Sequence, residues 1–201
     1  MNGLLRTAPI FCLVVFATPA FAHSPIMDIG GVFGGVLHAL LVLEHGLSLV
    51  ALGLVLGRQE PATRHSAMLI YTVALAFGLL AAALAIGEAL AADILLVTTG
   101  IMGLLIAAAW MPPFLGMPLG AIAGLTLALD SRPEATSTAE IVLMLIGSGI
   151  GAAVALAVVA EGSVFLKGDT RFIVARVAGS WIAAIAILVL SLRVVTWATV
   201  G

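Results

Sequence analysis

Six long apolar stretches, separated by short polar connections, dominate the chain after its first 22 residues. None alternates between apolar and polar positions as a membrane β-strand does. A helix needs about 20 residues to cross the hydrocarbon layer, and most of these stretches are that long. The pattern therefore predicts an all-α fold, a polytopic membrane bundle of about six transmembrane helices. These are expected at residues 29–57, 67–86, 89–110, 113–129, 140–160 and 172–192.

Composition supports lipid as the main solvent of the chain. Of its 201 residues 63% are hydrophobic and 9% are charged, and the mean hydropathy is +1.28. A soluble domain is about 45–50% apolar and about 25% charged, so this chain has too few polar residues to cover itself in water. The net charge of −2 and the lack of a basic stretch give no reason to expect a nucleic-acid partner.

Small residues recur at a spacing of four within several of the apolar stretches. In a bilayer this spacing lets two helix backbones approach closely and pack by van der Waals contact, so it predicts tight helix pairs. The pattern occurs at Gly30/Gly34, Gly31/Gly35, Gly53/Gly57, Gly116/Gly120/Gly124 and Gly147/Gly151.

The first 22 residues predict a cleaved secretory signal peptide. Arg6 supplies the positive n-region, residues 10–17 form an apolar h-region too short to span a membrane, and residues 20–22 read Ala-Phe-Ala, a small-x-small cleavage site. Cleavage there leaves residues 23–201 as a single six-helix transmembrane domain. The one cysteine, Cys12, is removed with the signal, so no disulfide or thiolate ligand is expected.

The distribution of lysine and arginine predicts the orientation of the bundle. A cleaved signal leaves the mature N-terminus in the periplasm, so the first, third and fifth connections face the cytoplasm. Five basic residues fall on that side and two on the other, in agreement with the positive-inside rule. We therefore expect a multi-pass protein of the bacterial inner (plasma) membrane. The inside residues are Arg58, Arg64, Lys167, Arg171 and Arg176, and the outside ones are Arg132 and Arg193.

Three ionisable residues, His38, Glu44 and His45, lie in the middle of the first predicted helix. An ionisable group within a span costs roughly 2.5–3.5 kcal/mol, so such a group is a functional candidate. On a helix, His45 returns to within about 20° of His38, whereas Glu44 lies about 120° away. A straight helix separates the two histidines by about 10.5 Å along its axis, too far for one metal ion. Two successive ion positions, or a local break in the helix, would resolve this.

A structural interpretation of the same residues is also open. The two histidines could be core side chains hydrogen-bonded to neighbouring helices, with Glu44 paired to one of them.

Weaker metal-ligand candidates are His23, Glu88 and Asp93. A mature N-terminal histidine offers an amine and a ring nitrogen, which suits copper or nickel.

The spacing of His38, Glu44 and His45 resembles the first-helix motif HPxxGxDH of the HupE/UreJ hydrogenase and urease accessory proteins. The setting is similar as well, with a signal segment ending in Ala-His, a glycine-rich stretch, and Leu-Ser-Leu-Val-Ala-Leu-Gly-Leu after the motif. Residues 87–89 and 175–179 show a looser likeness. The resemblance implies a six-helix permease-like protein connected with nickel or cobalt uptake. It also implies that His38, Glu44 and His45 handle the metal.

The chain departs from that family pattern at several positions. Glu44 replaces the usual aspartate, Ala39 the usual proline and Val42 the usual glycine. The family also carries a second histidine motif, HGxAHG, where the fourth helix ends. Residues 127–134 occupy that region here and contain no histidine.

We expect an inner-membrane permease for a divalent transition metal, nickel or cobalt foremost, that supports metalloenzyme maturation. Imidazole with carboxylate suits such ions, which are cargo here, and no tightly bound cofactor is expected. Expected partners are the lipid bilayer, the metal ion, and a further copy or a membrane complex. The alternative, which the missing histidine motif favours, is a non-transporting membrane subunit or assembly factor with a partly lost metal site.

Two enzymatic interpretations fail on the sequence. Ser148 between two glycines has the setting of an intramembrane protease nucleophile, but such a serine needs a basic partner, and no histidine follows His65. A haem with two axial histidines needs them on different helices, whereas His38 and His45 share one predicted helix. We therefore expect no enzymatic activity.

The predicted topology can be tested with fusions to a reporter enzyme that is active only in the periplasm. A reporter fused after Gly201 should be active, and one fused at Gln59 should be inactive. Inactivity at Gly201 would mean an odd number of crossings and would contradict the predicted helix count.

Overall fold

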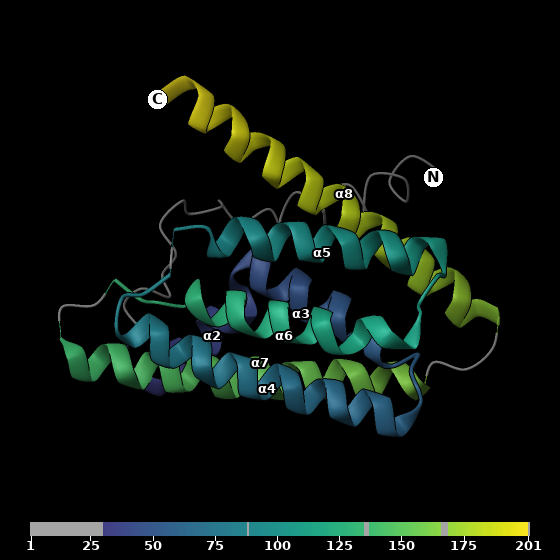
Figure 1. Cartoon of the computed structure of the whole chain (residues 1–201), viewed down its shortest axis with the longest axis horizontal. Helices are drawn as coiled ribbons and strands as arrows, with labels where there is room; N and C mark the ends of the chain where they lie inside the picture. The colour runs from purple at the N-terminus through teal and green to yellow at the C-terminus, as the bar shows by residue number, and fades with distance from the viewer. Residues whose placement is uncertain (1–29, 88, 135–136, 166–168, 201) are drawn as a thin grey trace, which may run out of the picture.

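The computed structural model describes residues 30–87, 89–134, 137–165 and 169–200. The predicted signal peptide and the candidates His23 and Glu88 lie outside these described residues. Helices make up nearly all of the described chain (Figure 1). They come in the order α2 (Gly31–Leu41), α3 (Leu43–Leu56), α4 (Pro61–Ala83), α5 (Ala91–Ala108), the short 3-10 turn η2 (Pro113–Leu115), α6 (Gly116–Leu129), α7 (Thr138–Phe165) and α8 (Asp169–Val200).

The helices form the predicted polytopic bundle, with two differences in the spans. α4, α5, α7 and α8 are long and apolar enough to cross a membrane, and α2 with α3 adds a fifth crossing if the pair is counted as one bent span. The predicted span over residues 29–57 is not one straight helix, because the chain bends by 69° between α2 and α3. The expected fourth crossing is the shorter apolar segment Pro113–Leu129.

Prolines and acidic residues account for several helix starts. Pro61 lies in the first turn of α4. A backbone N–H there has no intrahelical acceptor, so proline, which lacks the N–H, is tolerated at this position. Asp93 and Glu140 lie in the first turns of α5 and α7, where a carboxylate complements the positive end of the helix dipole. Pro112 and Pro113 separate α5 from α6, because proline disfavours helix at the residue before it.

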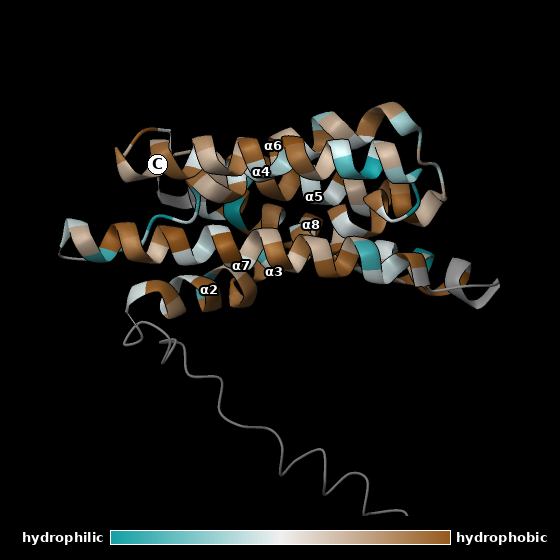
Figure 2. Ribbon diagram, turned by 90° about the horizontal axis from the view of Figure 1, so that it is seen from below, coloured by the Kyte–Doolittle hydropathy of each residue, from teal (hydrophilic) through white to brown (hydrophobic). Residues whose placement is uncertain are grey.

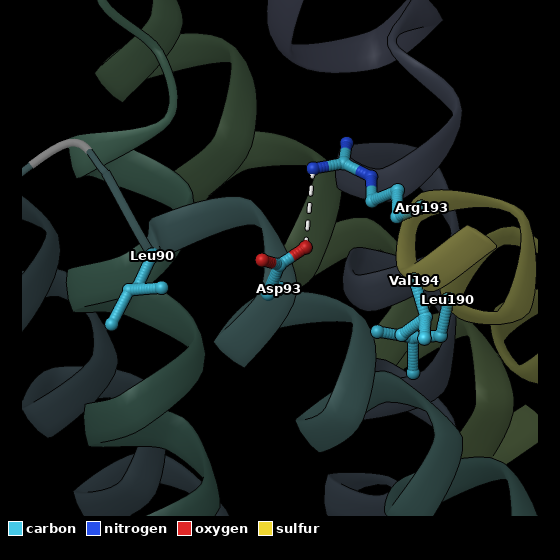
Figure 3. Close-up of a pocket in the computed structure, with 5 residues that line it drawn as sticks. All are labelled: Leu90, Asp93, Leu190, Arg193 and Val194. Atoms are coloured by element: carbon cyan, nitrogen blue, oxygen red, sulfur yellow. Dashed lines mark hydrogen bonds and ion pairs between the residues drawn. The ribbon is translucent and has the colours of Figure 1, made fainter. Parts of the chain in front are cut away.

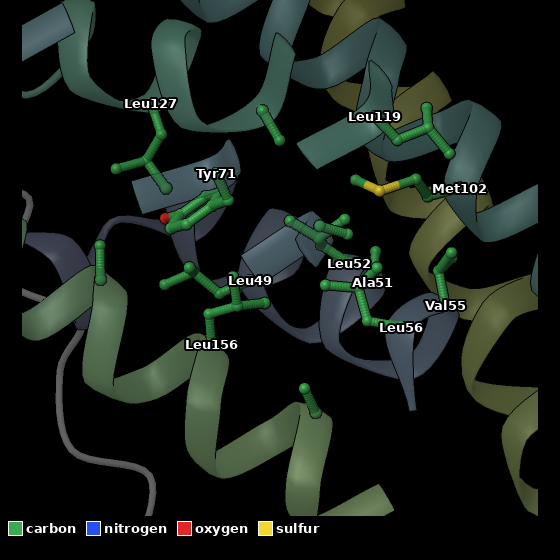
Figure 4. Packing of buried hydrophobic residues seen from close by; sticks show 14 of the residues in the cluster. Leu49, Ala51, Leu52, Val55, Leu56, Tyr71, Met102, Leu119, Leu127 and Leu156 are labelled. Carbon is green, nitrogen blue, oxygen red and sulfur yellow. The ribbon is translucent and has the colours of Figure 1, made fainter. Parts of the chain in front are cut away.

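α3 is the central helix of the bundle. It contacts all the other long helices, and more than half of its 14 residues are buried. Its apolar side chains pack in one cluster with Tyr71 of α4 and Met102 of α5 (Figure 4). The other helices surround α3 and expose large apolar side chains such as Phe77 and Trp181. The predominance of hydrophobic colouring on the outer ribbons in Figure 2 suits a protein whose surroundings are lipid tails.

Glycine allows neighbouring helices to pack at very short range, as the small-residue spacing predicted. α2 packs on α7, α4 on α6, and α5 on α8. A Cβ atom added at Gly35 would overlap the carbonyl of Met144, and one added at Gly103 would lie 2.7 Å from the Ala183 nitrogen. Equally close approaches occur at Gly53, Gly57, Gly78, Gly124, Gly147 and Gly179.

The polar side chains gather at two ends of the bundle. At one end, which we call the Asp130 end, Arg193 of α8 contacts Asp93 of α5, and Arg132 donates to the carbonyl of Ala82 at the end of α4. At the other, the Arg64 end, the Arg64 guanidinium makes two hydrogen bonds to Glu161 of α7, at 2.9 and 3.1 Å. Arg132 and Arg193 thus lie at one end and Arg64 at the other, which is the separation that the predicted topology requires.

The close helix packing can be tested with two glycine substitutions on α7. Gly147→Ala places a methyl group against the Val32 carbonyl, and we expect it to destabilise the protein by about 1–3 kcal/mol. Gly162→Ala is the matched control, since nothing lies within 4 Å of its added Cβ, and it should be neutral or stabilising by up to about 1 kcal/mol. Thermal unfolding followed by circular dichroism in detergent micelles measures both. Equal shifts for the two variants would refute the packing argument.

Candidate functional site

The break between α2 and α3 lies at Val42, inside the motif that the sequence singled out. Val42 has an extended backbone, with φ −66° and ψ 123°, and it is both the C-cap of α2 and the N-cap of α3. A β-branched residue tolerates this conformation well. The break leaves the first amides of α3 without intrahelical acceptors, and Glu44 lies in that first turn, where the helix dipole favours a carboxylate.

The break brings the two histidines together. The ring centroids of His38 and His45 are 5.3 Å apart, with an angle of 74° between the ring planes. Of the two alternatives that the sequence left open, the local helix break is therefore the one that the structure has. His45 is completely buried, and its Nδ1 and the Nε2 of His38 are buried atoms without a hydrogen-bond partner among the described residues.

Asp130 is a third member of this cluster. It follows the last residue of α6, and its Oδ2 accepts a hydrogen bond from Nε2 of His45 over 3.0 Å. A carboxylate at a helix C-terminus opposes the helix dipole, so its contact with the imidazole offsets an unfavourable position. The bond also orients the His45 ring and leaves Nδ1 as its open nitrogen.

Glu44 does not join the histidines, although it is next to His45 in the chain. Its Oε1 accepts a hydrogen bond from Nη2 of Arg193 at 2.8 Å, and Nη1 of the same arginine lies 3.4 Å from Oδ1 of Asp93. An open cleft of about 290 Å³ lies at this position (Figure 3). It is lined by Leu90, Asp93, Leu190, Arg193 and Val194.

The described site is thus an imidazole pair with Asp130 on one side, and a separate ion-pair group of Glu44, Asp93 and Arg193. Among the described residues, no three or more His, Cys, Asp or Glu side chains are placed to hold one metal ion. Two buried imidazole nitrogens are the available ligands at the centre.

Sequence reasoning missed Asp130 and the role of Arg193. Asp130 lies within residues 127–134, the region where the family carries its second histidine motif. That coincidence was the available signal. Arg193 was counted only as an outer positive charge, and nothing in its local sequence indicates two carboxylate partners on other helices.

Other polar side chains of the membrane segments have structural contacts. The Ser148 hydroxyl donates to the Gly35 carbonyl over 3.1 Å, which ties α7 to α2. At the Arg64 end, His65 lies on the surface with its Nε2 3.3 Å from Glu161. Neither contact supplies the base that a serine nucleophile needs.

The fold and this polar cluster define a polytopic helical membrane protein with two adjacent imidazoles, each with a buried unpartnered nitrogen, near one end of the bundle. A family profile described as HupE / UreJ protein matches residues 11–189, so the chain belongs to the HupE/UreJ family. The family is one of accessory and transport membrane proteins, and membership suggests a nickel or cobalt accessory protein. Comparisons with curated proteins and with solved structures gave no match.

The His45–Asp130 contact predicts the tautomer of His45. Because an ionised carboxylate only accepts hydrogen bonds, the His45 proton should reside on Nε2. ¹⁵N NMR of histidine-labelled protein, with His38→Ala and His65→Ala for assignment, measures this directly. Asp130→Ala should increase the population of the Nδ1–H form. A wild-type His45 protonated on Nδ1 alone would contradict the described geometry.

Proposed function

We propose that this protein is an inner-membrane permease for a divalent transition-metal ion, Ni²⁺ or Co²⁺, with His38 and His45 as the central ligands. The observation that carries the proposal is the pair of buried, unpartnered nitrogens on two adjacent imidazole rings. A buried polar atom without a hydrogen-bond partner costs about 1–3 kcal/mol of stability. Two such nitrogens therefore destabilise a packed core unless they bind something. Neutral imidazole nitrogen is a preferred ligand of nickel, cobalt and zinc.

The spacing of the rings suits a shared ion. With a metal–nitrogen bond of about 2.1 Å, an ion lies about 3.3 Å from the centroid of each imidazole ring. Two rings with centroids 5.3 Å apart then subtend about 110° at the ion, close to a tetrahedral angle. Asp130 supports His45 from the far side of the ring, as carboxylates commonly support metal-binding histidines.

A site with two protein ligands suits transport better than permanent binding. Structural metal sites commonly hold the ion with four protein ligands, whereas a permease must release its cargo again. On the side of the imidazoles that faces the Arg64 end the core is apolar, and Leu49, Leu52 and Leu56 of α3 lie in the same buried cluster as Leu127 (Figure 4). The described conformation is therefore closed between the imidazole pair and the Arg64 end, and passage requires a movement of α3 relative to its neighbours.

The second candidate is a non-transporting membrane subunit or assembly factor that retained the fold. The lack of three converging ligands among the described residues favours it. The two candidates differ in one measurable respect, since only a permease couples metal binding at the imidazole pair to uptake.

The proposal predicts that purified protein in detergent binds one Co²⁺ or Ni²⁺ per chain. His38→Ala and His45→Ala should each weaken binding by about tenfold or more, because each removes one ligand of a site with few ligands. In cells, both variants should lower Ni²⁺ uptake to background while the protein remains inserted and abundant. Isothermal titration calorimetry and ⁶³Ni accumulation measure the two effects.

His65→Ala is the matched control, because His65 is an exposed histidine at the opposite end, and its binding and uptake should equal the wild type. Metal binding without any uptake would favour the non-transporting subunit. If the wild type bound metal no better than the His38→Ala, Glu44→Gln double variant, the imidazole pair would be a structural feature and both candidates would lose their metal site.

A further inference from the structure

Besides the imidazoles, three buried polar side chains have atoms without a hydrogen-bond partner among the described residues. They are the Gln59 amide, the Tyr71 hydroxyl and the Thr99 hydroxyl. Tyr71 and Thr99 are completely buried, and Gln59 is 8% exposed. Such atoms are rare in packed interiors, because each has lost its hydrogen bonds to water without replacement. In membrane bundles, buried polar groups commonly line the path of a substrate or an ion.

Gln59 and Tyr71 lie against the same face of α6, which consists of Gly116, Gly120 and Gly124. A Cβ atom added at Gly116 would overlap both polar atoms of the Gln59 amide. One added at Gly120 would lie 3.7 Å from Cβ of Tyr71, and one added at Gly124 would lie 3.1 Å from its ring atom Cδ2. Glycine at these positions therefore lets both polar side chains lie directly on the α6 backbone.

This glycine face of α6 runs from the Arg64 end towards the imidazole pair. Gln59 lies at the Arg64 end, where its backbone carbonyl accepts a hydrogen bond from the Arg64 guanidinium over 3.5 Å. At its other end α6 leads into Asp130, which is hydrogen-bonded to His45. At 1.5 Å per residue, about 21 Å of helix separates Gly116 from Asp130.

The Tyr71 side chain lies about halfway along the glycine face and points towards the Asp130 end. Its Cβ is beside Gly120, whereas its ring edge is beside Gly124, one turn nearer to that end. In Figure 4 the hydroxyl lies on the side of Leu127, away from Leu119. A phenol oxygen without a hydrogen-bond partner among the described residues is thus present in the otherwise apolar core between the imidazole pair and the Arg64 end.

We propose that the glycine face of α6 lines the inward route of the divalent ion, and that Tyr71 and Gln59 are the polar contacts of the ion along it. The inference rests on the proposed function. The phenol and amide oxygens accept hydrogen bonds from water that the ion carries, which lowers the cost of moving a charge through an apolar core. Both groups are neutral, so they hold the ion weakly and let it move on.

The route is closed in the described conformation. α4 and the connection between α3 and α4 cover the glycine face, with Gln59 directly against Gly116. Because Gln59 follows the end of α3 by three residues, a movement of α3 relative to its neighbours also moves the Gln59 amide on α6.

The test compares Tyr71→Phe and Gln59→Leu with the wild type. Cells report ⁶³Ni accumulation per inserted protein, and purified full chains in detergent micelles report Co²⁺ affinity and thermal unfolding. Loss of a hydrogen bond to a charged species should slow Ni²⁺ uptake about tenfold or more in each variant. Co²⁺ affinity should equal that of the wild type, because the imidazole pair is intact. Thermal stability should not fall, because the described conformation loses no hydrogen bond.

Thr126→Val is the matched control, since it removes another buried hydroxyl from α6 itself. That hydroxyl donates to the Ile122 carbonyl of its own helix over 2.7 Å, so it is already paired. The variant should accumulate Ni²⁺ like the wild type. A loss of uptake equal to that of Tyr71→Phe would show a general effect of buried hydroxyls and would contradict the route.

The outcomes distinguish this inference from the proposed function. Wild-type uptake in both Tyr71→Phe and Gln59→Leu overturns the route and leaves the permease proposal standing. A parallel loss of Co²⁺ affinity or of thermal stability in both variants gives the two side chains a structural role and also overturns the route. A wild type that binds Co²⁺ but accumulates no Ni²⁺ refutes the permease proposal together with the route.

Discussion

The backbone break at Val42 is the constraint on which the arrangement of the polar residues depends. A continuous helix would place His38 and His45 almost two turns apart, about 10.5 Å along its axis. With the break, the centroids of the two rings lie 5.3 Å apart. The break also starts a new helix one residue before Glu44, so this carboxylate lies at a helix N-terminus. One residue with extended backbone thereby sets the imidazole pair and separates it from the acidic group.

Pairing of charges explains how a bundle of mostly apolar helices tolerates ionisable groups within its spans. Glu44 and Asp93 share Arg193, Asp130 accepts from His45, and Glu161 contacts Arg64. Each of these carboxylates has a partner on another helix, and the pairing matters most for Glu44, the least exposed of the four. The open nitrogens of His38 and His45 are different, since the structure offers them no protein partner. That difference is the physical basis for the proposal that the imidazoles bind the metal ion.

Close packing of α3 against its neighbours holds both groups in place. Glycine at the contacts of α3 with α7, and of α5 with α8, allows approaches that any side chain would prevent. The same packing fills the bundle between the imidazole pair and the Arg64 end with leucine side chains (Figure 4). The proposed permease function therefore requires this apolar core to open, because burying an unpaired charge among apolar side chains is very costly.

The sequence by itself determined the membrane environment, the helical class and the family, and it singled out His38 and His45 as candidates, because hydropathy, small-residue spacing and a motif are local properties of the chain. It left open whether the first helix was straight, and it assigned Glu44 to the metal together with the histidines. Only the tertiary structure brought Asp130 to His45 and Arg193 to Glu44, across sequence separations of 85 and 149 residues. Such contacts depend on how helices from distant parts of the chain pack side by side, and no local pattern records which side chains will meet.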